Sequence, residues 1–189
     1  MRTFTHSWAA ALLAAFTGGC SASSLLHVQA GGVIGTSGAL GGALEGSAGR
    51  GLAPVGLEVT ARAKFTDRVL SGAIGSGLYL VGTGYEGRPF GFAHGGMHLL
   101  QVDVIDATPF VSAFSPYLNF GLGLCVDGCG SALSHDRYNV TTTDSLDVGV
   151  ITVGLSAEYA VRFLRDGEGF FGLSVGFARF SRATTRANF

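Results

Sequence analysis

The sequence contains little charge. Asp, Glu, Lys and Arg make up 13% of its 189 residues, about half of the usual quarter. The formal net charge is −1 and no run of basic residues occurs, so nucleic-acid binding has no electrostatic support. Hydrophobic residues reach 47%, which is the opposite of the balance found in disordered chains.

The sequence also lacks a hydrophobic run long enough for a membrane-spanning helix, which requires roughly 20 residues. Residues 8–16 form a nine-residue apolar run, preceded by the positive charge of Arg2 and followed by Thr17 and two glycines. This order is typical of a signal peptide. We therefore predict a signal peptide at 1–19, an anchor or linker at 20–24 and a single domain at 25–189.

Cysteine is scarce as well, with three in the whole chain. Gly18-Gly19-Cys20 resembles a bacterial lipobox, which implies a lipidated Cys20 as the first mature residue; ordinary cleavage nearby, for example after Ala22, is the alternative. Cys125 and Cys129 remain, and an oxidising compartment favours a disulfide between them over free thiols. No second pair or nearby His completes a zinc site, so we predict no metal.

Alternation of residue types is the dominant pattern in what is present. Within 147–163, the odd positions from 151 onward are mostly bulky and apolar, as at Val153 and Leu155, whereas the even ones are small or polar, as at Thr152 and Gly154. A period of two indicates a strand with two different faces. The same division predicts strands at 25–34, 54–66, 69–82, 91–105, 110–126, 147–163 and 169–180.

Residues 36–52 consist mainly of Gly, Ala and Ser and are compatible with a long loop or with weak strands. The connections after the first strand then alternate between long and short, as in an up-and-down barrel. Single-chain bacterial barrels have even strand numbers. An eighth strand is therefore expected from 36–52 or from 181–189.

The charged residues of the predicted strands indicate which face is inside, because they lie on the small-residue face. They are Glu58, Arg62, Lys64, Asp103, Glu158 and Arg162. If the bulky face pointed inward, water would meet a surface with few charges, whereas soluble surfaces carry about 25–35% charged residues. If it points outward, acids and bases share the lumen and can pair. We predict an all-β, antiparallel up-and-down transmembrane β-barrel of eight strands, with these charges as an internal ion-pair network; a narrow pathway is the alternative.

Residues 25–180 resemble the small outer-membrane β-barrels of Gram-negative bacteria, of the OmpA-like transmembrane type. The segment Gly172-Leu173-Ser174-Val175-Gly176-Phe177 partly matches the C-terminal assembly signal of that family, although the chain continues to Phe189. The resemblance implies a location in the outer membrane of a Gram-negative bacterium, contact with outer-membrane lipid, and recognition of the C-terminal strand by the barrel-assembly machinery.

Candidate catalytic patterns are weak. Ser134, His135 and Asp136 are adjacent in sequence and cannot adopt the geometry of a triad. On a strand, His94 and His98 stand about 13 Å apart, too far to share a metal, and are expected in the lumen or at a rim. We predict no catalytic residue and no cofactor.

The leading hypothesis is therefore a non-enzymatic outer-membrane barrel with a structural or surface-interaction role. That role would be carried by loops at 36–52, 83–91 and 127–146. One alternative is a periplasmic lipoprotein whose soluble, lipocalin-like barrel binds an apolar ligand. Another is a lipid-modifying barrel enzyme of the outer membrane.

Overall fold

The computed structural model describes residues 20–83, 90–105, 107–112, 114–129, 134–138, 141–162 and 166–187. The predicted signal peptide lies outside these residues. The strands are β1 (Cys20–Gly35), β2 (Leu40–Leu52), β3 (Val55–Thr66), β4 (Val69–Thr83), β5 (Phe90–Ile105), β6 (Thr108–Ser112), β7 (Ser115–Asp127), β8 (Ser134–Tyr138), β9 (Thr141–Ala160) and β10 (Glu168–Ala187). No helix with the length and hydropathy needed to cross a membrane occurs in this part of the chain.

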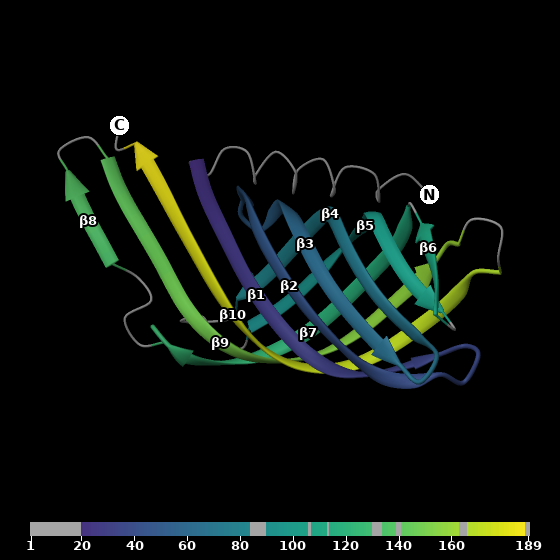
Figure 1. Ribbon diagram of the computed structural model, residues 1–189. Coiled ribbons are helices and arrows are strands. Elements are labelled where there is room, and N and C mark those ends of the chain that lie inside the picture. Colours follow the sequence, from purple (N-terminus) through teal and green to yellow (C-terminus); the bar gives the residue numbers. More distant parts are fainter. Residues whose placement is uncertain are drawn as a thin grey trace, which may run out of the picture.

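Eight strands form a closed antiparallel barrel (Figure 1). The ring runs in chain order through β1, β2, β3, β4, β5, β7, β9 and β10, and the pairing of β10 with both β9 and β1 closes it. The predicted fold class is confirmed. The two short strands extend this ring. One part of β5, residues 101–105, pairs with β6, and the part before it, residues 90–98, pairs with β7. The strand β8 pairs with β9 beyond the end of β7.

The eighth strand is β2, which lies within the segment left open between loop and strand. It pairs along its length with β1 and, from Gly41 onward, with β3. Its outward positions include the exposed Leu40, Leu44 and Leu52 as well as small residues such as Gly46 and Ala48. Glycines also occupy the inward face, at Gly49 and Gly51, so the period of two is weak in this segment. The loop interpretation of 36–52 is therefore wrong; the connection between β1 and β2 occupies only 36–39.

The first strand begins earlier than predicted. Residues 20–24, assigned to a linker, pair with residues 181–185 of β10 as part of β1. Ser23 is buried and its hydroxyl lies 2.9 Å from the hydroxyl of Tyr79, while Ser24 and Ser181 are joined at 2.6 Å. These serines continue the alternation without bulky residues, which explains why the periodicity did not reveal them.

The two rims of the barrel differ. One, the turn rim, carries the connections at 36–39, 67–68, 106–107 and 161–167. The other, the terminal rim, carries the connections at 53–54, 84–89 and 128–140 together with the start of β1 and the end of β10. Beyond the terminal rim, β8, β9, β10 and β1 continue side by side as a sheet extension, visible at the upper left of Figure 1.

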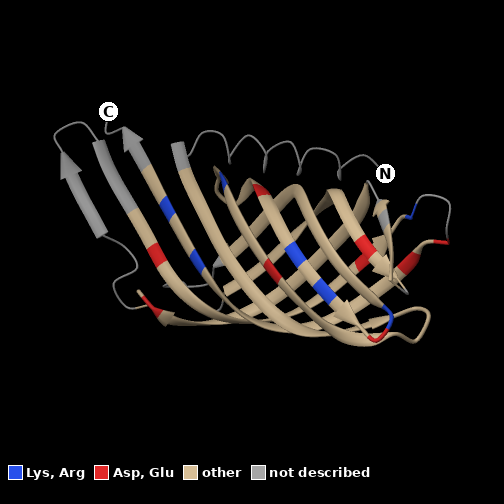
Figure 2. Cartoon of the chain, viewed as in Figure 1, with Lys and Arg blue, Asp and Glu red and all other residues tan. Residues whose placement is uncertain are grey.

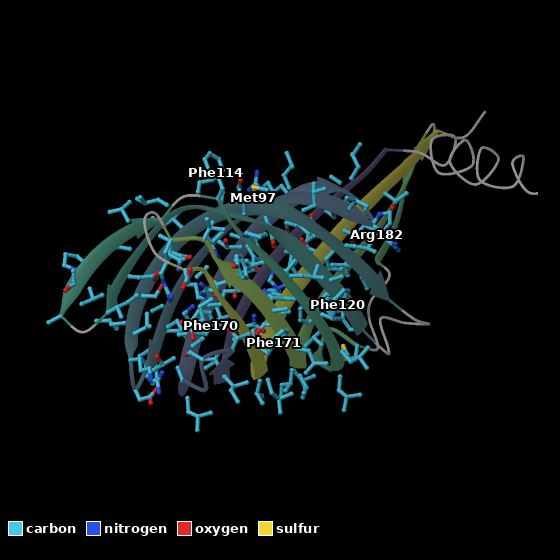
Figure 3. The ribbon with its side chains drawn as sticks, turned by 90° about the vertical axis from the view of Figure 1, so that its right-hand side faces the viewer. Met97, Phe114, Phe120, Phe170, Phe171 and Arg182 are labelled. Atoms are coloured by element: carbon cyan, nitrogen blue, oxygen red, sulfur yellow. A yellow bond between two sulfur atoms is a disulfide. The ribbon has the colours of Figure 1, made fainter. Side chains whose placement is uncertain are left out.

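The bulky face points outward, as predicted. Leu155, Val153, Leu122 and Leu173 are 53–73% exposed, and large exposed hydrophobic side chains occur on all eight strands of the ring. On β10, Phe171 is 57% exposed whereas the adjacent Phe170 is buried (Figure 3). Such a continuous apolar exterior fits lipid and not water. It is incompatible with a soluble barrel that holds an apolar ligand between inward bulky residues.

A β-bulge on β5 explains one break in the alternation. The pairing of β4 with β5 shifts at Gly75, which is opposite His98, and Leu99 and Leu100 are both exposed. The extra residue changes the parity of the inward face, as bulges do. His94 and His98 before it therefore share the lumen with Gln101 and Asp103 after it.

Candidate functional site in the barrel lumen

The lumen contains all six of the charged residues that the alternation placed there. They are Glu58 and Lys64 on β3 with the less deeply buried Arg62, Asp103 on β5, Glu158 on β9, and Arg162 just after it. Figure 2 shows the acidic and basic positions on the strands of the barrel, among mostly uncharged residues. Buried charges of this kind require partners, since an unpaired one is strongly destabilising.

Glu158 is the centre of the first group of contacts. Its carboxylate accepts hydrogen bonds from Arg62 and from Lys64, the latter at 3.1 Å between Nζ and Oε2. His98 Nδ1 lies 3.6 Å from the same carboxylate. The Lys64 ammonium also lies 3.2 Å from the ring centroid of Phe170, a favourable cation–π position. One carboxylate therefore joins β3, β5 and β9.

A second group closes the lumen at the turn rim. Arg162 donates to Asp103 at 3.1 Å and to Glu168 at 3.0 Å. Gln101 donates to Asp103 at 2.9 Å, and Ser37 donates to Glu168. The guanidinium thus connects β5 to the start of β10, and it lines a recess of about 420 Å³ at this rim.

A third group joins the predicted lumen residues Glu58 and His94 to Glu45, Tyr117 and Asn119, which were not predicted. Glu58 lies 3.0 Å from His94 Nδ1 and accepts a hydrogen bond from Tyr117 at 3.0 Å. Glu45 accepts one from Asn119 at 2.9 Å and lies 3.9 Å from His94. The inward position of Glu45 follows from the parity of β2 once that segment is recognised as a strand.

The lumen residues described above hold five carboxylates, on Glu45, Glu58, Asp103, Glu158 and Glu168, and three fixed positive charges, on Arg62, Lys64 and Arg162. The carboxylates outnumber the basic groups, and two of them accept hydrogen bonds from neutral donors. The amide of Asn119 donates to Glu45, and the hydroxyl of Tyr117 donates to Glu58. Hydrogen bonds to a charged group are stronger than those between neutral groups. Each of these carboxylates therefore has a partner without a one-to-one match of charges, whereas Glu58 Oε2 and both ring nitrogens of His98 lack a hydrogen bond to the described residues.

An apolar plug occupies the half of the lumen nearer the terminal rim. Its side chains are Leu25, Tyr79, Val81, Phe90, Phe92, Leu146, Val148, Val150, Ala178 and Phe180. The ring of Phe90 packs against Phe92 and Phe180 with centroids 6.2 and 6.1 Å apart. Phe92 also lies 4.6 Å from the ring of His27, where the plug meets the polar half. The predicted filling of the bore by charges alone was therefore incomplete.

Little free volume remains between the groups. A cavity of about 30 Å³ lies between Arg62, Lys64, Glu158, Asn119 and Ser174, enough for one or two water molecules. A filled interior is typical of barrels of about eight strands.

The other predicted positions lie outside the lumen network. Cys125 and Cys129 form a disulfide with a Cα–Cα distance of 5.8 Å, at the end of β7. The side chains of Ser134, His135 and Asp136 on β8 lie outside the described residues. Cys20 opens β1, and its lipidation remains a prediction.

In the described part of the chain, no residues are arranged as a metal site or as a catalytic Ser–His pair. No group of three or more His, Cys, Asp or Glu residues is placed to hold a metal ion there. Each described histidine lies in the lumen, and His27 contacts a hydroxyl, that of Thr152, at 3.2 Å. That pair lies among aromatic side chains, away from either rim.

The strand pairing and the apolar exterior define the class of protein as an eight-stranded transmembrane β-barrel. Neither a family model nor a curated protein matches the chain. Among solved structures it is similar to Neisserial surface protein A (NspA), with 12% identity, a TM-score of 0.49, and coverage of 83% of this chain and 95% of that one. It is also similar to a de novo designed transmembrane β-barrel, with 12% identity, a TM-score of 0.36, and coverage of 84% and 94%. Likenesses at this identity concern shape and carry no statement about activity.

Proposed function

We propose that this protein is a non-enzymatic β-barrel of a Gram-negative outer membrane, with a structural role in the membrane and an interaction role outside it. The observation that carries the proposal is the filled lumen. One half is occupied by paired charges and the other by the apolar plug, and between the described lumen charges lies a cavity of only about 30 Å³.

The interaction role belongs to the terminal rim. The segment 36–52 no longer supports it, because it is mostly β2. Of the predicted loops, 127–146 contributes the disulfide ring, β8 and the start of β9. The loop at 83–91 lies largely outside the described residues. We therefore assign the interaction role to the disulfide ring and the sheet extension.

Two further parts of the proposal concern how the protein reaches the membrane. A lipidated Cys20 would stand at the first residue of β1, at the terminal rim. The barrel-assembly machinery would recognise β10, the strand that closes the ring against β1. A closing strand is a suitable signal, because before it pairs with β1 it presents an edge of unpaired backbone groups.

Expression in a Gram-negative host, with and without Cys20→Ser, tests the proposal. We expect both forms to stay in the outer-membrane pellet after a carbonate wash. Both should also migrate differently in gels before and after boiling, because the folded barrel resists detergent. Release of Cys20→Ser without detergent would show that lipid on Cys20 is the sole anchor, and would overturn the proposal.

A further inference from the structure

Two arginines point outward at the edge of the apolar belt near the terminal rim. Arg50 on β2 is opposite Ser24 of β1, and Arg179 on β10 is opposite Leu26 of the same strand. Both are exposed and lie on either side of β1. Figure 2 shows the basic positions on β10 beside an acidic position of β9. At this depth, basic side chains reach the headgroups of the lipids around the barrel.

The surface between the two arginines is hollowed. A recess of about 480 Å³ is lined by both of them together with Ser24, Ala48 and Ser181. Its lining also includes Leu26 and the acidic Asp147, and its volume leaves room for a headgroup. The hydroxyls of Ser24 and Ser181, 2.6 Å apart, add hydrogen-bonding capacity.

The charge of this recess is positive on balance. Arg179 is held by two hydrogen bonds to Asp147, at 3.1 and 2.7 Å. Arg50, in contrast, makes no salt bridge with any carboxylate of the described residues. The recess therefore presents one uncompensated guanidinium, with a second one fixed in place opposite it. A phosphate is the group that the free guanidinium of Arg50 suits best, while Arg179 contributes its charge and the N–H groups that Asp147 leaves free.

An apolar groove continues from the recess toward the middle of the membrane. Its volume is about 620 Å³, and its walls include Val28, Leu44, Ile74 and Leu100. Its floor consists of small residues on three neighbouring strands, Gly46, Ala61, Ala63 and Gly72. A Cβ added at Gly72 would meet nothing within 4 Å, so the hollow there is open.

The recess and the groove are connected through neighbouring positions of two strands. Ala48 lines the recess and Gly46, the next outward residue of β2, lines the groove. Leu26 and Val28 are related in the same way on β1. A headgroup in the recess therefore places an acyl chain directly over the groove.

We propose that this wall binds one anionic glycerophospholipid, with its phosphate between Arg50 and Arg179 and an acyl chain in the groove. The inference rests on the proposed outer-membrane location and names a lipid partner within it. The start of β1 and the end of β10 lie at the terminal rim, so a barrel inserted from the periplasm keeps this rim on the periplasmic side. The leaflet there consists of glycerophospholipids, which makes them the occupant in preference to lipopolysaccharide.

Native mass spectrometry of the purified full-length barrel tests the site, with dioleoyl phosphatidylglycerol and dioleoyl phosphatidylcholine supplied in equal amounts. We expect the wild type to retain phosphatidylglycerol preferentially. Arg50→Gln should reduce this preference about fivefold, the factor for one basic residue at an anionic surface. Arg68→Gln is the matched control, because Arg68 is also exposed but lies at the turn rim.

A second pair of variants tests the groove. Gly72→Leu fills it and should reduce retention of both lipids, whereas Gly82→Leu points into a different outer-wall hollow and should not. Equal retention of the two phospholipids by wild type, or equal effects of Arg50→Gln and Arg68→Gln, would overturn the site. So would tighter retention of added lipid A. A protein that shows the gel shift but no lipid preference refutes this inference alone, whereas one without the shift refutes the proposed function.

Discussion

Glu158 shows how one residue determines the stability of the lumen. Its carboxylate is the partner of two buried basic side chains and lies near a histidine. Replacing it with Gln keeps the volume but leaves Arg62 and Lys64 buried without a counter-charge. Removal of one partner of a buried ion pair costs about 3–5 kcal/mol. We expect Glu158→Gln to lower the free energy of unfolding by that amount in urea titrations of the detergent-solubilised barrel.

The matched control for this variant is Asp166→Asn, at an exposed position beside the turn rim. It removes one carboxylate charge without leaving a buried base unpaired, so its effect should stay below about 1 kcal/mol. If both variants changed stability equally, the pairing around Glu158 would have no special role, and the lumen network would be weaker than its burial suggests.

At the residue scale, the sequence predicts where charges point better than which charges pair. The parity of β3 and β9 placed Glu58, Lys64 and Glu158 in the lumen without knowledge of the structure. Pairing depends on which strands face each other across the barrel, and a period of two does not contain this information. Glu45 was missed for a different reason, because glycines on both faces of its strand weaken the period that the outward leucines would otherwise reveal.

At the scale of single elements, β2 shows why a strand can be hidden in a glycine-rich sequence. Its glycines serve close contacts: a Cβ added at Gly51 would lie 2.2 Å from the Cα of Gly56 on β3. One added at Gly46, on the outer wall, would meet its nearest atom at 4.0 Å. The composition that favoured a loop therefore reflects the approach of neighbouring strands. Long-range pairing overrides local propensity here.

This difference between two glycines of one strand gives a test of the element. Gly51→Val forces β2 and β3 apart, and overpacking of this kind costs about 1–3 kcal/mol or more. Gly46→Val projects into lipid and should be tolerated. We expect the first variant to lose the gel shift on boiling at a lower temperature than the wild type, and the second to behave like the wild type. The reverse order would show that β2 is not paired as described.

At the scale of the whole molecule, the lumen is sealed twice along the barrel axis. The paired charges occupy the half nearer the turn rim, and the apolar plug occupies the half nearer the terminal rim. The plug was not predicted, because Phe90, Phe92 and Phe180 lie on the face that elsewhere carries small and polar residues. That the bulky face points outward was predictable, because all the alternating segments support the same choice between the two faces.

Two seals in series give a definite expectation for conductance. The wild-type barrel in a planar lipid bilayer should show no current steps, because neither half leaves a path wider than one or two waters. Truncating the plug by Phe90→Ala with Phe180→Ala should cost about 3–5 kcal/mol for each ring, yet the bilayer should remain silent, since Arg62, Lys64 and Arg162 stay paired in the other half. Current steps from the truncated plug would show that the ionic half is permeable and that the rings alone close the barrel. Steps from the wild type would contradict the filled lumen and, with it, a purely structural role.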